Sequence, residues 1–442
     1  MARQLFGTDG VRGRAGHFLT AELALKLARA AVQRLDVRRP QVLIVRDTRE
    51  SGEMLESAIA AGVAGAGGDA LLAGVLPTPA APLLIRRHRF QLAAVISASH
   101  NPYEDNGIKL FASDGFKLHD DAEHQIEADL DKALAPPPEI GRVGRFHGAL
   151  EDYLGELHER FGKLDLSGRR ILLDCANGAT FRAAPEIIRR LGAEVDTLAD
   201  QPDGRNINAG CGSTHLDCLI AAMREDPHDV GFAFDGDGDR VLAVDSSGAV
   251  IDGDELIALA ARHLRARDRL PGNGVVVTVM TNYGFHRAME AAGIEVAITP
   301  VGDRYVLEEL RRRGWALGGE QSGHILELGF GPSGDGIASA LLALEALGDR
   351  RIEDRVSFQR LPQRLINVRA EDRAAMTGAM DDPTVRAAIE QEDSELRGRG
   401  RVLVRPSGTE PLIRVMVEAP SEEETEAVCT RISRAVEQAL SG

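Results

Sequence analysis

Aromatic side chains are scarce in this chain of 442 residues: they make up 4% of the sequence, with a single Trp. Proteins that bind single-stranded nucleic acid stack bases on aromatic rings, so we expect no such platform here. Basic residues are also in the minority, because 68 acidic residues outweigh 52 Lys and Arg and leave a formal charge of −16. This charge disfavours non-specific binding to nucleic acid or anionic lipid, although local basic groups remain able to hold a small anion.

Cysteines and long apolar runs are also few. The four cysteines show no CxxC spacing, which is typical of a reduced protein rather than a disulfide framework. The first residues, "MARQLFGTDGVRGRAG", contain no apolar core of signal-peptide type, so we expect no signal peptide and a cytoplasmic location. The longest Ala-rich stretch is interrupted by Gly67, Gly68 and Asp69. It therefore predicts a helix, a turn and a strand instead of a membrane span.

A pattern of strand, polar turn, helix, glycine and strand occurs three times, over residues 41–79, 169–200 and 274–300. In each copy a glycine follows the helix, where a left-handed C′ residue is expected. Continuous Val, Ile and Leu strands that alternate with helices indicate sheets with parallel pairs, buried on both faces. We therefore predict three related α/β units with mixed sheets.

Breaks in this pattern suggest the domain boundaries. Residues 134–148 are rich in Pro and Gly and are predicted to be a connection. A helix is predicted over 151–164, and a helix capped near Asp252 or Asp254 is predicted to open the third unit. Beyond about residue 365, short strands and charged helical segments predict a smaller C-terminal α+β domain. The predicted domains are 1–150, 151–252, 253–365 and 366–442.

Three aspartates separated by single glycines follow an apolar strand in "VGFAFDGDGDRVLAVD". Asp235, Asp237 and Asp239 repel one another at this spacing, and a cation makes the arrangement favourable. Oxygen ligands alone favour Mg²⁺, Ca²⁺ or Mn²⁺ over zinc. An EF-hand loop needs Gly at position six and Glu at position twelve, where this chain has Arg240 and Ser246, so that alternative fails. The remaining alternative to a metal site is a solvated acidic turn.

Ser99 lies where the apolar strand of "AAVISASHNPYEDNGIKLF" gives way to a polar turn. It is a turn-forming serine, the nucleophile of a hydrolase with His100 as base, or a phosphate carrier. Adjacent residues of an extended chain point in opposite directions, so we expect Ser99 and His100 to make a poor pair. There is also no Gly-x-Ser-x-Gly elbow. A phosphate on Ser99 would carry a charge of about −1.5 to −2, which suits a nearby metal and Lys109.

Two further motifs carry groups suited to a sugar phosphate. "RPSGTEPLIR" presents two arginines and two hydroxyl groups around a glycine turn, the groups that bind a phosphate dianion, unless it is an ordinary hairpin turn. "GGEQSGH" offers Glu320, Ser322 and His324, which are able to bind sugar hydroxyls and transfer a proton, although the motif is weak in isolation. The four segments fall in the four predicted domains, one in each, so we predict an active site in a central cleft between the domains.

At these residues the sequence resembles the α-D-phosphohexomutase superfamily. "SASHNP", "DGDGDR", "GEQSGH" and "RPSGTEP" match its four signature loops in order, and the match spans essentially the whole chain. Within the superfamily, "FGTDGVRG", "DGRNINAGCGSTH" and "TPVGDRYVLEEL" resemble the phosphoglucosamine mutase branch.

The resemblance implies interconversion of glucosamine 6-phosphate and glucosamine 1-phosphate, which supplies UDP-N-acetylglucosamine synthesis for the bacterial cell wall. It implies that Ser99 is the phosphorylated residue and that Mg²⁺ binds its phosphate together with Asp235, Asp237 and Asp239. Phosphoserine would donate its phosphoryl group to the substrate and give glucosamine 1,6-bisphosphate. That intermediate would then turn around and rephosphorylate Ser99.

The resemblance also assigns roles to other residues. Lys109, Arg240 and Arg12 would stabilise the transferring phosphoryl group, and Lys109 and His324 are the candidates for acid–base work at the sugar hydroxyl. Glu320 and Ser322 would hold sugar hydroxyls. The non-reacting phosphate would be held by Arg405, Ser407, Gly408, Thr409 and Arg414.

Other functions stay open at this point. A mutase of the same superfamily could prefer glucose or mannose phosphates. A metal-dependent sugar phosphatase or a non-catalytic phosphosugar sensor could use the same fold, although a phosphatase must admit water to the phosphoenzyme. We expect a small sugar phosphate as partner, no nucleic acid and no membrane, and a monomer or homodimer.

Overall fold

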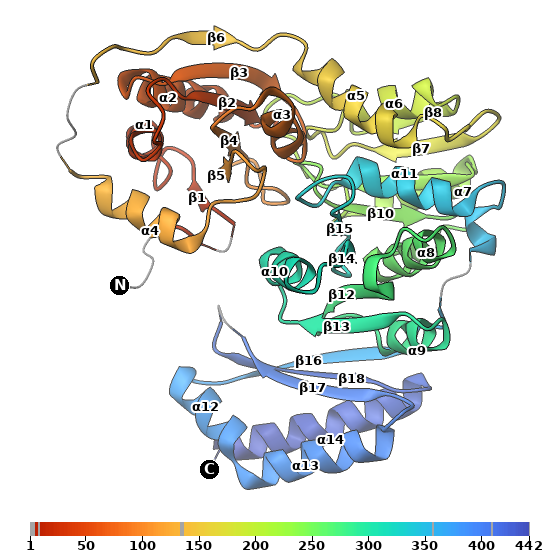
Figure 1. Cartoon of the computed structure of the whole chain (residues 1–442). Coiled ribbons are helices and arrows are strands. Elements are labelled where there is room, and N and C mark those ends of the chain that lie inside the picture. The colour runs from red at the N-terminus through yellow and green to blue at the C-terminus, as the bar shows by residue number, and fades with distance from the viewer. Residues whose placement is uncertain (1–4, 8, 133–136, 356–357, 408–409, 442) are drawn as a thin grey trace. The chain divides into compact units, whose positions relative to one another are not determined.

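The computed structural model describes residues 5–7, 9–132, 137–355, 358–407 and 410–441 of the chain. The chain divides into two compact units (Figure 1). The larger unit comprises residues 1–280 and 294–357, and the smaller unit comprises residues 281–293 and 358–442.

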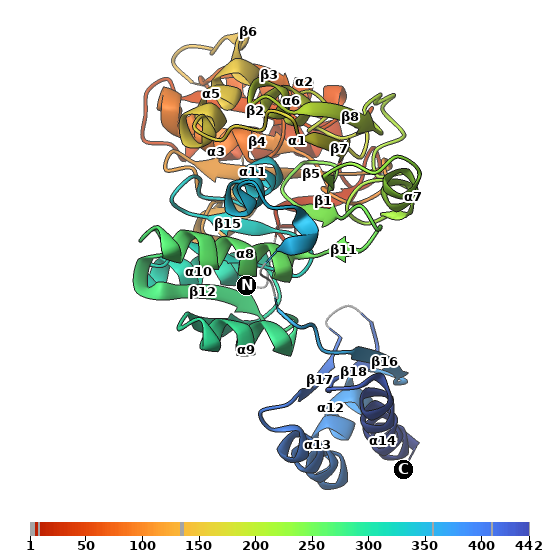
Figure 2. The same cartoon turned by 90° about the vertical axis from the view of Figure 1, so that its right-hand side faces the viewer.

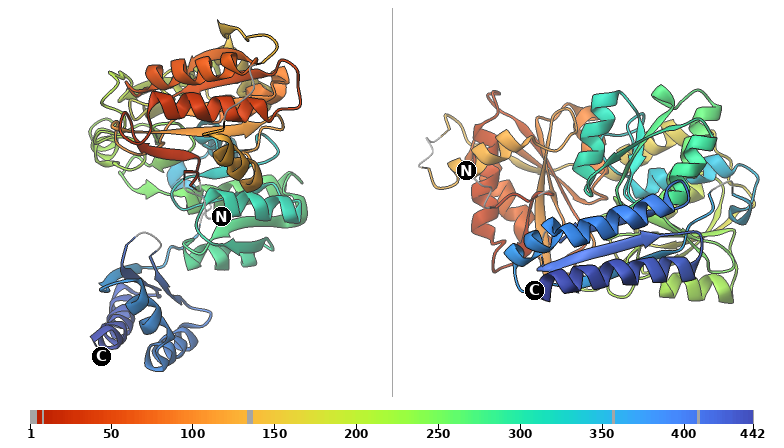
Figure 3. Two further views of the ribbon diagram at one scale, coloured as in Figure 1. Left: turned by 90° about the vertical axis from the view of Figure 1, so that its left-hand side faces the viewer. Right: turned by 90° about the horizontal axis from the view of Figure 1, so that it is seen from below.

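The N-terminal part of the larger unit is a six-stranded mixed sheet covered by helices. Its elements are β1 (Val11–Arg14), α1 (Ala21–Gln33), β2 (Gln41–Arg46), α2 (Gly52–Gly65), β3 (Asp69–Val75), α3 (Ala80–His88), β4 (Leu92–Ile96), β5 (Asp105–Ala112), α4 (Asp120–Asp129) and β6 (Val143–Arg145). The strand order is β1-β5-β4-β2-β3-β6. Strands β4, β2, β3 and β6 are parallel, whereas β5 is antiparallel to both β4 and β1. Helices α1 and α2 lie side by side against the sheet (Figure 3). Every residue of β4 is buried, as expected for a central strand covered on both faces.

A five-stranded mixed sheet follows in the chain. Its elements are α5 (Ala149–Phe161), β7 (Arg170–Asp174), α6 (Ala183–Arg190), β8 (Glu194–Leu198), α7 (Asp217–Glu225), β9 (Val230–Phe234), β10 (Val241–Val244) and β11 (Val250–Ile251). The strand order is β11-β10-β9-β7-β8. Strands β8, β7 and β9 are parallel, and β10 turns back antiparallel to β9. The loop between β9 and β10 therefore leaves the carboxyl end of a buried parallel strand.

The third sheet of the larger unit has four strands in the order β13-β12-β14-β15. Its region contains α8 (Gly253–Ala266), η1 (Pro271–Asn273), β12 (Gly274–Thr278), β13 (Glu295–Thr299), α10 (Asp303–Arg313), β14 (Leu317–Gly319), β15 (Ile325–Glu327), α11 (Gly336–Leu347) and η2 (Ile352–Asp354). Strands β13, β12 and β14 are parallel, and β15 forms an antiparallel pair with β14. The turn of this pair contains the "GEQSGH" motif.

The smaller unit is a three-stranded antiparallel sheet with helices (Figures 1 and 2). Its elements are α9 (Tyr283–Ala291), β16 (Gln363–Arg369), α12 (Arg373–Asp381), α13 (Pro383–Leu396), β17 (Arg401–Pro406), β18 (Leu412–Glu418) and α14 (Glu422–Ser441). The strand order is β16-β18-β17, and α13 and α14 lie against the sheet. The buried Glu418 accepts a 2.8 Å hydrogen bond from the Tyr283 backbone and thereby ties α9 to the sheet.

These observations confirm the predicted fold class of three α/β units with mixed sheets and a smaller α+β domain. The glycines predicted to end the three helices, Gly67, Gly192 and Gly293, all have positive φ. One difference lies in the predicted connection at 134–148, where β6 pairs with β3 because the edge of that sheet offers free backbone groups. The domain boundaries and the central cleft stay predictions. None of the helices in the described part of the chain combines the length and hydropathy that a bilayer crossing needs.

Candidate active site

Two strand ends of the larger unit bring the predicted phosphate carrier to the predicted metal loop. Ser99 follows β4, and Asp235 follows β9 directly. The Ser99 hydroxyl donates a 2.6 Å hydrogen bond to Asp235 Oδ2, across 136 residues of sequence. Ligands of α/β proteins bind at the carboxyl ends of parallel strands, so the contact lies where this fold places its chemistry.

Ser99 has a left-handed backbone conformation, with φ of 52°. The expectation that Ser99 and His100 point apart is wrong, because it assumed an extended backbone. The turn brings His100 Nδ1 to 3.4 Å from the Ser99 Oγ, still a longer contact than the one to Asp235. Burial lowers the pKa of His100, and the charges of Arg240 and Arg12 lower it further. Ser99 therefore has a neutral imidazole as neighbour and a carboxylate as its principal partner.

Asp235, Asp237 and Asp239 are all buried, and each offers an oxygen within 4.8 Å of the others. Burial raises the pKa of Asp235 well above its ordinary value, and the charges of Asp239 and Asp237 raise it further. Asp237 Oδ1 is buried without a hydrogen-bond partner among the described residues, and Asp239 Oδ1 has only long contacts, to His324 Nδ1 at 3.5 Å and Arg240 Nε at 3.8 Å. Unsatisfied buried carboxylate oxygens that repel one another need a cation. The residues present therefore fit a hard divalent cation such as Mg²⁺.

Three predicted cationic residues lie around the triplet. Lys109 on β5 is 1% exposed, and its Nζ lies 2.9 Å from Asp237 Oδ2 and 3.8 Å from Asp239 Oδ2. Burial alone would lower the pKa of Lys109, but Asp237 and other carboxylates raise it above its ordinary value. The Arg240 backbone donates to Asp235 Oδ1 at 3.1 Å, and its side chain lies 3.8 Å from Asp239. Charged groups of both signs thus meet at the aspartate triplet, which holds the Ser99 hydroxyl through Asp235.

Arg12 lies on β1, and its side chain forms an ion pair with Asp9. Burial alone would lower the pKa of Arg12, but Asp9, Asp237 and Asp239 raise it. The structure therefore places this predicted residue in the same electrostatic cluster.

The "GEQSGH" turn adds groups from the third sheet. His324 is buried, and its Nδ1 lies 3.5 Å from Asp239 Oδ1. Burial alone would lower the pKa of His324, but Asp239, Asp303 and Glu320 raise it to about 9. Glu320 accepts a 2.9 Å hydrogen bond from the Gly302 backbone, and Ser322 is exposed. The predicted proton-transfer residue therefore contacts the metal loop, whereas Ser322 does not contact it through any described hydrogen bond.

An ion-pair chain that the sequence analysis missed joins the first and third sheets. Lys117 Nζ lies 2.5 Å from Asp9 Oδ1 and 2.6 Å from Asp303 Oδ2. Asp9 Oδ2 also lies 3.1 Å from Lys109 Nζ, and Asp303 lies 4.0 Å from His324 Nε2. A cavity in the larger unit is lined by Lys109, Lys117, Asp303 and His324 among others. Asp9 lies in "FGTDGVRG" and Asp303 in "TPVGDRYV", two motifs that the resemblance already singled out. Lys117 lies in no such motif, so the sequence did not indicate its role.

The phosphate-binding candidates of "RPSGTEP" lie in the smaller unit. Arg405 and Arg414 are directly opposite each other on β17 and β18. Partial burial lowers the pKa of Arg405, and the charge of Arg414 lowers it further. Ser407 is buried, and its Oγ accepts from the Glu410 backbone at 3.4 Å. Gly408 and Thr409 lie outside the described residues.

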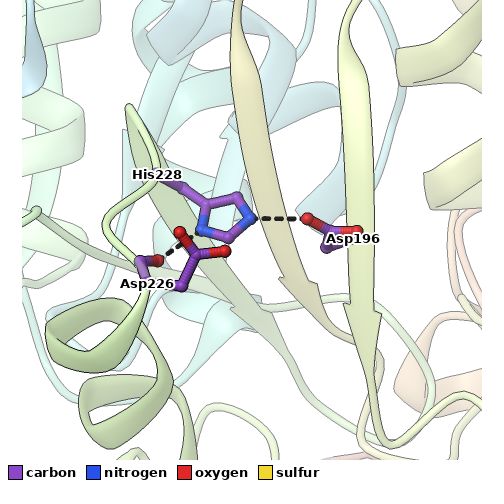
Figure 4. Close-up of side chains that lie close together, drawn as sticks. All are labelled: Asp196, Asp226 and His228. Atoms are coloured by element: carbon purple, nitrogen blue, oxygen red, sulfur yellow. Dashed lines mark hydrogen bonds and ion pairs between the residues drawn. The ribbon is translucent and has the colours of Figure 1, made fainter.

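A second group of potential metal ligands lies at the edge of the second sheet (Figure 4). His228 contacts Asp196 Oδ2 through Nε2 at 2.8 Å and the Asp226 carbonyl through Nδ1 at 2.7 Å. Arg170 donates to both carboxylate oxygens of Asp226, at 3.1 and 2.9 Å. Unlike the aspartate triplet, this group has no unsatisfied buried side-chain atom among the described residues. The guanidinium already neutralises the carboxylates, so we interpret the group as a surface ion-pair cluster.

Comparison with protein families supports the resemblance over the whole chain. Four models of phosphoglucomutase/phosphomannomutase match: α/β/α domain I over residues 3–136, domain II over 151–248, domain III over 252–362 and the C-terminal domain over 365–435. Among solved structures, a phosphoglucomutase/phosphomannomutase family protein from Burkholderia thailandensis has a TM-score of 0.83 at 23% identity, covering 98% of this chain and 97% of that one. An N-acetylphosphoglucosamine mutase from Aspergillus fumigatus has a TM-score of 0.68 at 18% identity, covering 99% and 96%. These two structures share the fold.

Curated relatives are much more similar in sequence. The phosphoglucosamine mutase of Desulforudis audaxviator is 49% identical and that of Moorella thermoacetica 48% identical, covering 97% and 98% of this chain and 98% of each relative. The phosphoglucosamine mutase of Alcanivorax borkumensis is 45% identical over the full length of both chains. With identity near one half over nearly the whole length, and with the serine and aspartate loops in contact, the chain belongs to the phosphoglucosamine mutase family of the phosphohexomutase superfamily.

Proposed function

We propose that this protein interconverts glucosamine 6-phosphate and glucosamine 1-phosphate through a phosphoserine at Ser99 and a 1,6-bisphosphate intermediate. The observation that carries the proposal is the 2.6 Å hydrogen bond from the Ser99 hydroxyl to Asp235, inside a buried triplet of carboxylates. A serine so placed has a metal site beside it and only a long contact to an imidazole whose pKa is lowered, which suits a phosphoryl carrier better than a hydrolytic nucleophile.

Mg²⁺ is the proposed cofactor. Asp235, Asp237, Asp239 and the phosphate on Ser99 would hold it, and the Aspergillus fumigatus enzyme was solved in complex with GlcNAc-6P and magnesium. When bound, the ion would neutralise charge on the oxygens of the transferring phosphoryl group.

The cationic side chains would stabilise and position the phosphoryl group. Lys109, Arg12 and Arg240 place positive charge around the aspartate triplet, one member of which holds the Ser99 hydroxyl, in a largely buried setting where such charge acts strongly. The raised pKa of Lys109 keeps it charged and favours charge stabilisation over action as a base. In the transfer, the bond from phosphorus to Ser99 Oγ breaks and one to a sugar oxygen forms. The pKa of His324, raised to about 9, holds it as an imidazolium beside Asp239. We therefore assign it as the acid that protonates the sugar oxygen when the phosphoryl group returns to Ser99, and in the opposite direction the neutral imidazole takes the sugar hydroxyl proton back.

Substrate binding is assigned to two motifs. Glu320 and Ser322 would bind sugar hydroxyls. The phosphate that does not react would be held by Arg405, Ser407, Gly408, Thr409 and Arg414. Both ends of the bisphosphate must occupy each position in turn, so we expect activity on glucose and mannose phosphates at a lower rate.

The four free cysteines support a cytoplasmic location.

One assay tests the proposal. Purified protein with Mg²⁺ and a trace of sugar bisphosphate should isomerise glucosamine 6-phosphate faster than glucose or mannose 6-phosphate. Release of inorganic phosphate at the rate of substrate loss would indicate a phosphatase instead. Binding without turnover would indicate a sensor, and preference for glucose or mannose phosphate would reassign the substrate.

Intact-mass spectrometry tests the carrier directly. The parent should gain one phosphate on incubation with the bisphosphate, and Ser99→Ala should gain none and lose nearly all turnover. Ser57→Ala, on the exposed side of α2, is the matched control and should behave like the parent. Full activity in Ser99→Ala would remove Ser99 from the mechanism.

A further inference from the structure

The backbone carbonyls around Ser99 are held by two side chains from different parts of the larger unit. The Ser99 carbonyl accepts hydrogen bonds of 2.9 Å from Arg49 Nη2 and 2.9 Å from Asn208 Nδ2. The Asn101 carbonyl accepts from the same two groups, at 2.9 and 3.1 Å. Arg49 Nη1 also donates to the carbonyls of Pro102 and Asp105. One guanidinium and one amide thus fix four carbonyls of the carrier loop.

Arg49 is itself held rigidly. Its side chain is 0% exposed, and its Nε lies 2.8 Å from Asp47 Oδ2. Asp47 also accepts a 2.6 Å hydrogen bond from Ser97 Oγ, which in turn accepts one from the Ser99 backbone N–H at 2.9 Å. The network therefore forms hydrogen bonds with both the backbone N–H and the backbone carbonyl of Ser99. A buried guanidinium has five donors in a fixed plane, a geometry that Lys does not offer.

Asn208 reaches the loop from the second sheet region. Its own φ is 57°, a conformation that Asn tolerates. Gly236 of the aspartate loop lies at the same point, where an added Cβ would come within 2.7 Å of both the Ser99 carbonyl and Asn208 Nδ2. The aspartate loop, Asn208 and the serine loop therefore meet at one carbonyl, which fixes the Ser99 hydroxyl relative to Asp235.

We propose that Arg49 and Asn208 are positioning residues for the phosphoryl carrier, which hold Ser99 in its left-handed conformation and turn its carbonyl dipoles away from the phosphate. The left-handed conformation is unfavourable for a residue with a Cβ and persists only when its surroundings enforce it. An in-line transfer depends on placement, and a shift of about 1 Å costs about a hundredfold in rate. This inference rests on the proposed function, since it assumes that Ser99 carries the phosphate.

The experiment measures transfer from phosphorylated enzyme in a single turnover. Parent and variants are phosphorylated with glucose 1,6-bisphosphate, freed of excess reagent and mixed with glucosamine 6-phosphate, and the loss of phosphate from Ser99 is followed by intact mass. Arg49→Lys keeps the charge beside Asp47 but loses the planar fork. Asn208→Gly removes the amide while tolerating positive φ. Asn177→Gly is the matched control, because Asn177 also has positive φ, 46°, and its side-chain amide contacts Asn206, Cys211 and the Gln201 backbone N–H but no carbonyl of the Ser99 loop in any described hydrogen bond.

We expect the rate constant per phosphorylated molecule to fall about tenfold or more in Arg49→Lys and in Asn208→Gly. KM should stay within about threefold of the parent, since the phosphate-binding arginines are untouched. The double variant should lose less than the product of the single losses, because both side chains serve the same carbonyls. The ³¹P resonance of phosphoserine should shift in both variants and remain unchanged in Asn177→Gly.

A purely structural role would lower the melting temperature and the active fraction but leave the rate constant per phosphorylated molecule and the ³¹P resonance unchanged, which would overturn the proposal. If Arg49→Lys does not fold, Asn208→Gly decides the question. A parent that takes no phosphate at Ser99 would contradict the proposed function itself. Normal transfer in the parent and in both variants would contradict only the positioning role.

Discussion

At the residue scale, the aspartate triplet combines a destabilising arrangement with a binding site. Asp235 is fully buried beside two other carboxylates, and both its burial and their charges raise its pKa. Without a cation, the charged form of Asp235 costs folding free energy, whereas a bound divalent ion reverses the sign of this contribution. Sites that bind or catalyse are often less stable than the surrounding fold for this reason.

Asp235→Asn should therefore raise the melting temperature of the metal-free protein and reduce the stabilisation by Mg²⁺. A gain of about 1 kcal/mol in EDTA would shift the melting temperature upward by about 2 °C. Thermal melts in EDTA and in excess Mg²⁺ measure both effects, and activity should fall about a hundredfold or more. Asp196→Asn, in the ion-pair cluster beside Arg170, is the control and should leave the Mg²⁺ dependence unchanged. Equal Mg²⁺ stabilisation of Asp235→Asn and the parent would contradict the metal site.

His286 on α9 makes a separate prediction about pH. Burial and, to a smaller extent, the charge of Arg401 together lower its pKa to about 4. An unfolded His titrates near pH 6.5, so unfolding takes up a proton between about pH 6.5 and 4. Stability is therefore present above pH 6.5 and is lost as the pH falls through this window, by up to about 3 kcal/mol.

His286→Gln should flatten this part of the pH profile. Melting temperatures measured from pH 7 to pH 4 should fall less steeply in the variant than in the parent. His17→Gln, at an exposed position, should keep the slope of the parent. An unchanged slope in His286→Gln would mean that another group controls acid sensitivity.

At the scale of elements, Lys117 connects the first sheet to the start of α10. It lies between two carboxylates, Asp9 and Asp303, at 2.5 and 2.6 Å. Removing it leaves both carboxylates without this partner, and Asp303 also lies next to the imidazole of His324. We expect Lys117→Met to cost about 3 kcal/mol, the lower end of the range for a buried pair, because 26% of the side chain is exposed.

The measurement for Lys117→Met is a thermal melt together with kcat and KM. The melting temperature should fall by several degrees, and turnover should fall because α10 and His324 lose their tie to the first sheet. Lys132→Met is the control: its ion pair with Asp129 is 63% exposed on the Lys side, and surface pairs contribute about 0 to 1 kcal/mol. If both variants melted alike, the buried ion pair would contribute nothing to the joining of these elements.

Elements and signature loops could be predicted from the sequence because their signals are local. The aspartate loop follows an apolar strand, the three helix-ending glycines follow periodic helices, and α8 begins beside Asp252 as expected. The contact between Lys117 and Asp303 spans 186 residues, and nothing around Lys117 indicates it. Arg49 was missed for the same reason, since its partners are carbonyl groups that carry no sequence signal. The wrong expectation about His100 came from assigning Ser99 an ordinary backbone.

At the scale of the whole molecule, the motifs are divided between two compact units. Ser99, the aspartate triplet and His324 belong to the larger unit, whereas Arg405 and Arg414 belong to the smaller one. The assignment of one motif to each of the four predicted domains stays a prediction, because it rests on breaks in local patterns of strands and helices. How the units combine depends on surfaces that no local pattern encodes.

The paired arginines of the smaller unit make the last prediction. Arg405 and Arg414 face each other across β17 and β18, and like charges directly opposite are unfavourable in a sheet. A phosphate dianion would turn this repulsion into two charge-assisted contacts.

Arg414→Gln should therefore raise KM for glucosamine 6-phosphate by about tenfold to a hundredfold, since a hydrogen bond to a charged group is worth about 1.5 to 3 kcal/mol. It should change the single-turnover transfer from phosphoserine to saturating substrate much less, because the transferring groups lie in the other unit. Arg364→Gln, whose side chain is 54% exposed and pairs with Glu426, should retain the KM of the parent. An unchanged KM in Arg414→Gln would mean that the non-reacting phosphate binds elsewhere, whereas a loss confined to kcat would place Arg414 in the transfer step itself.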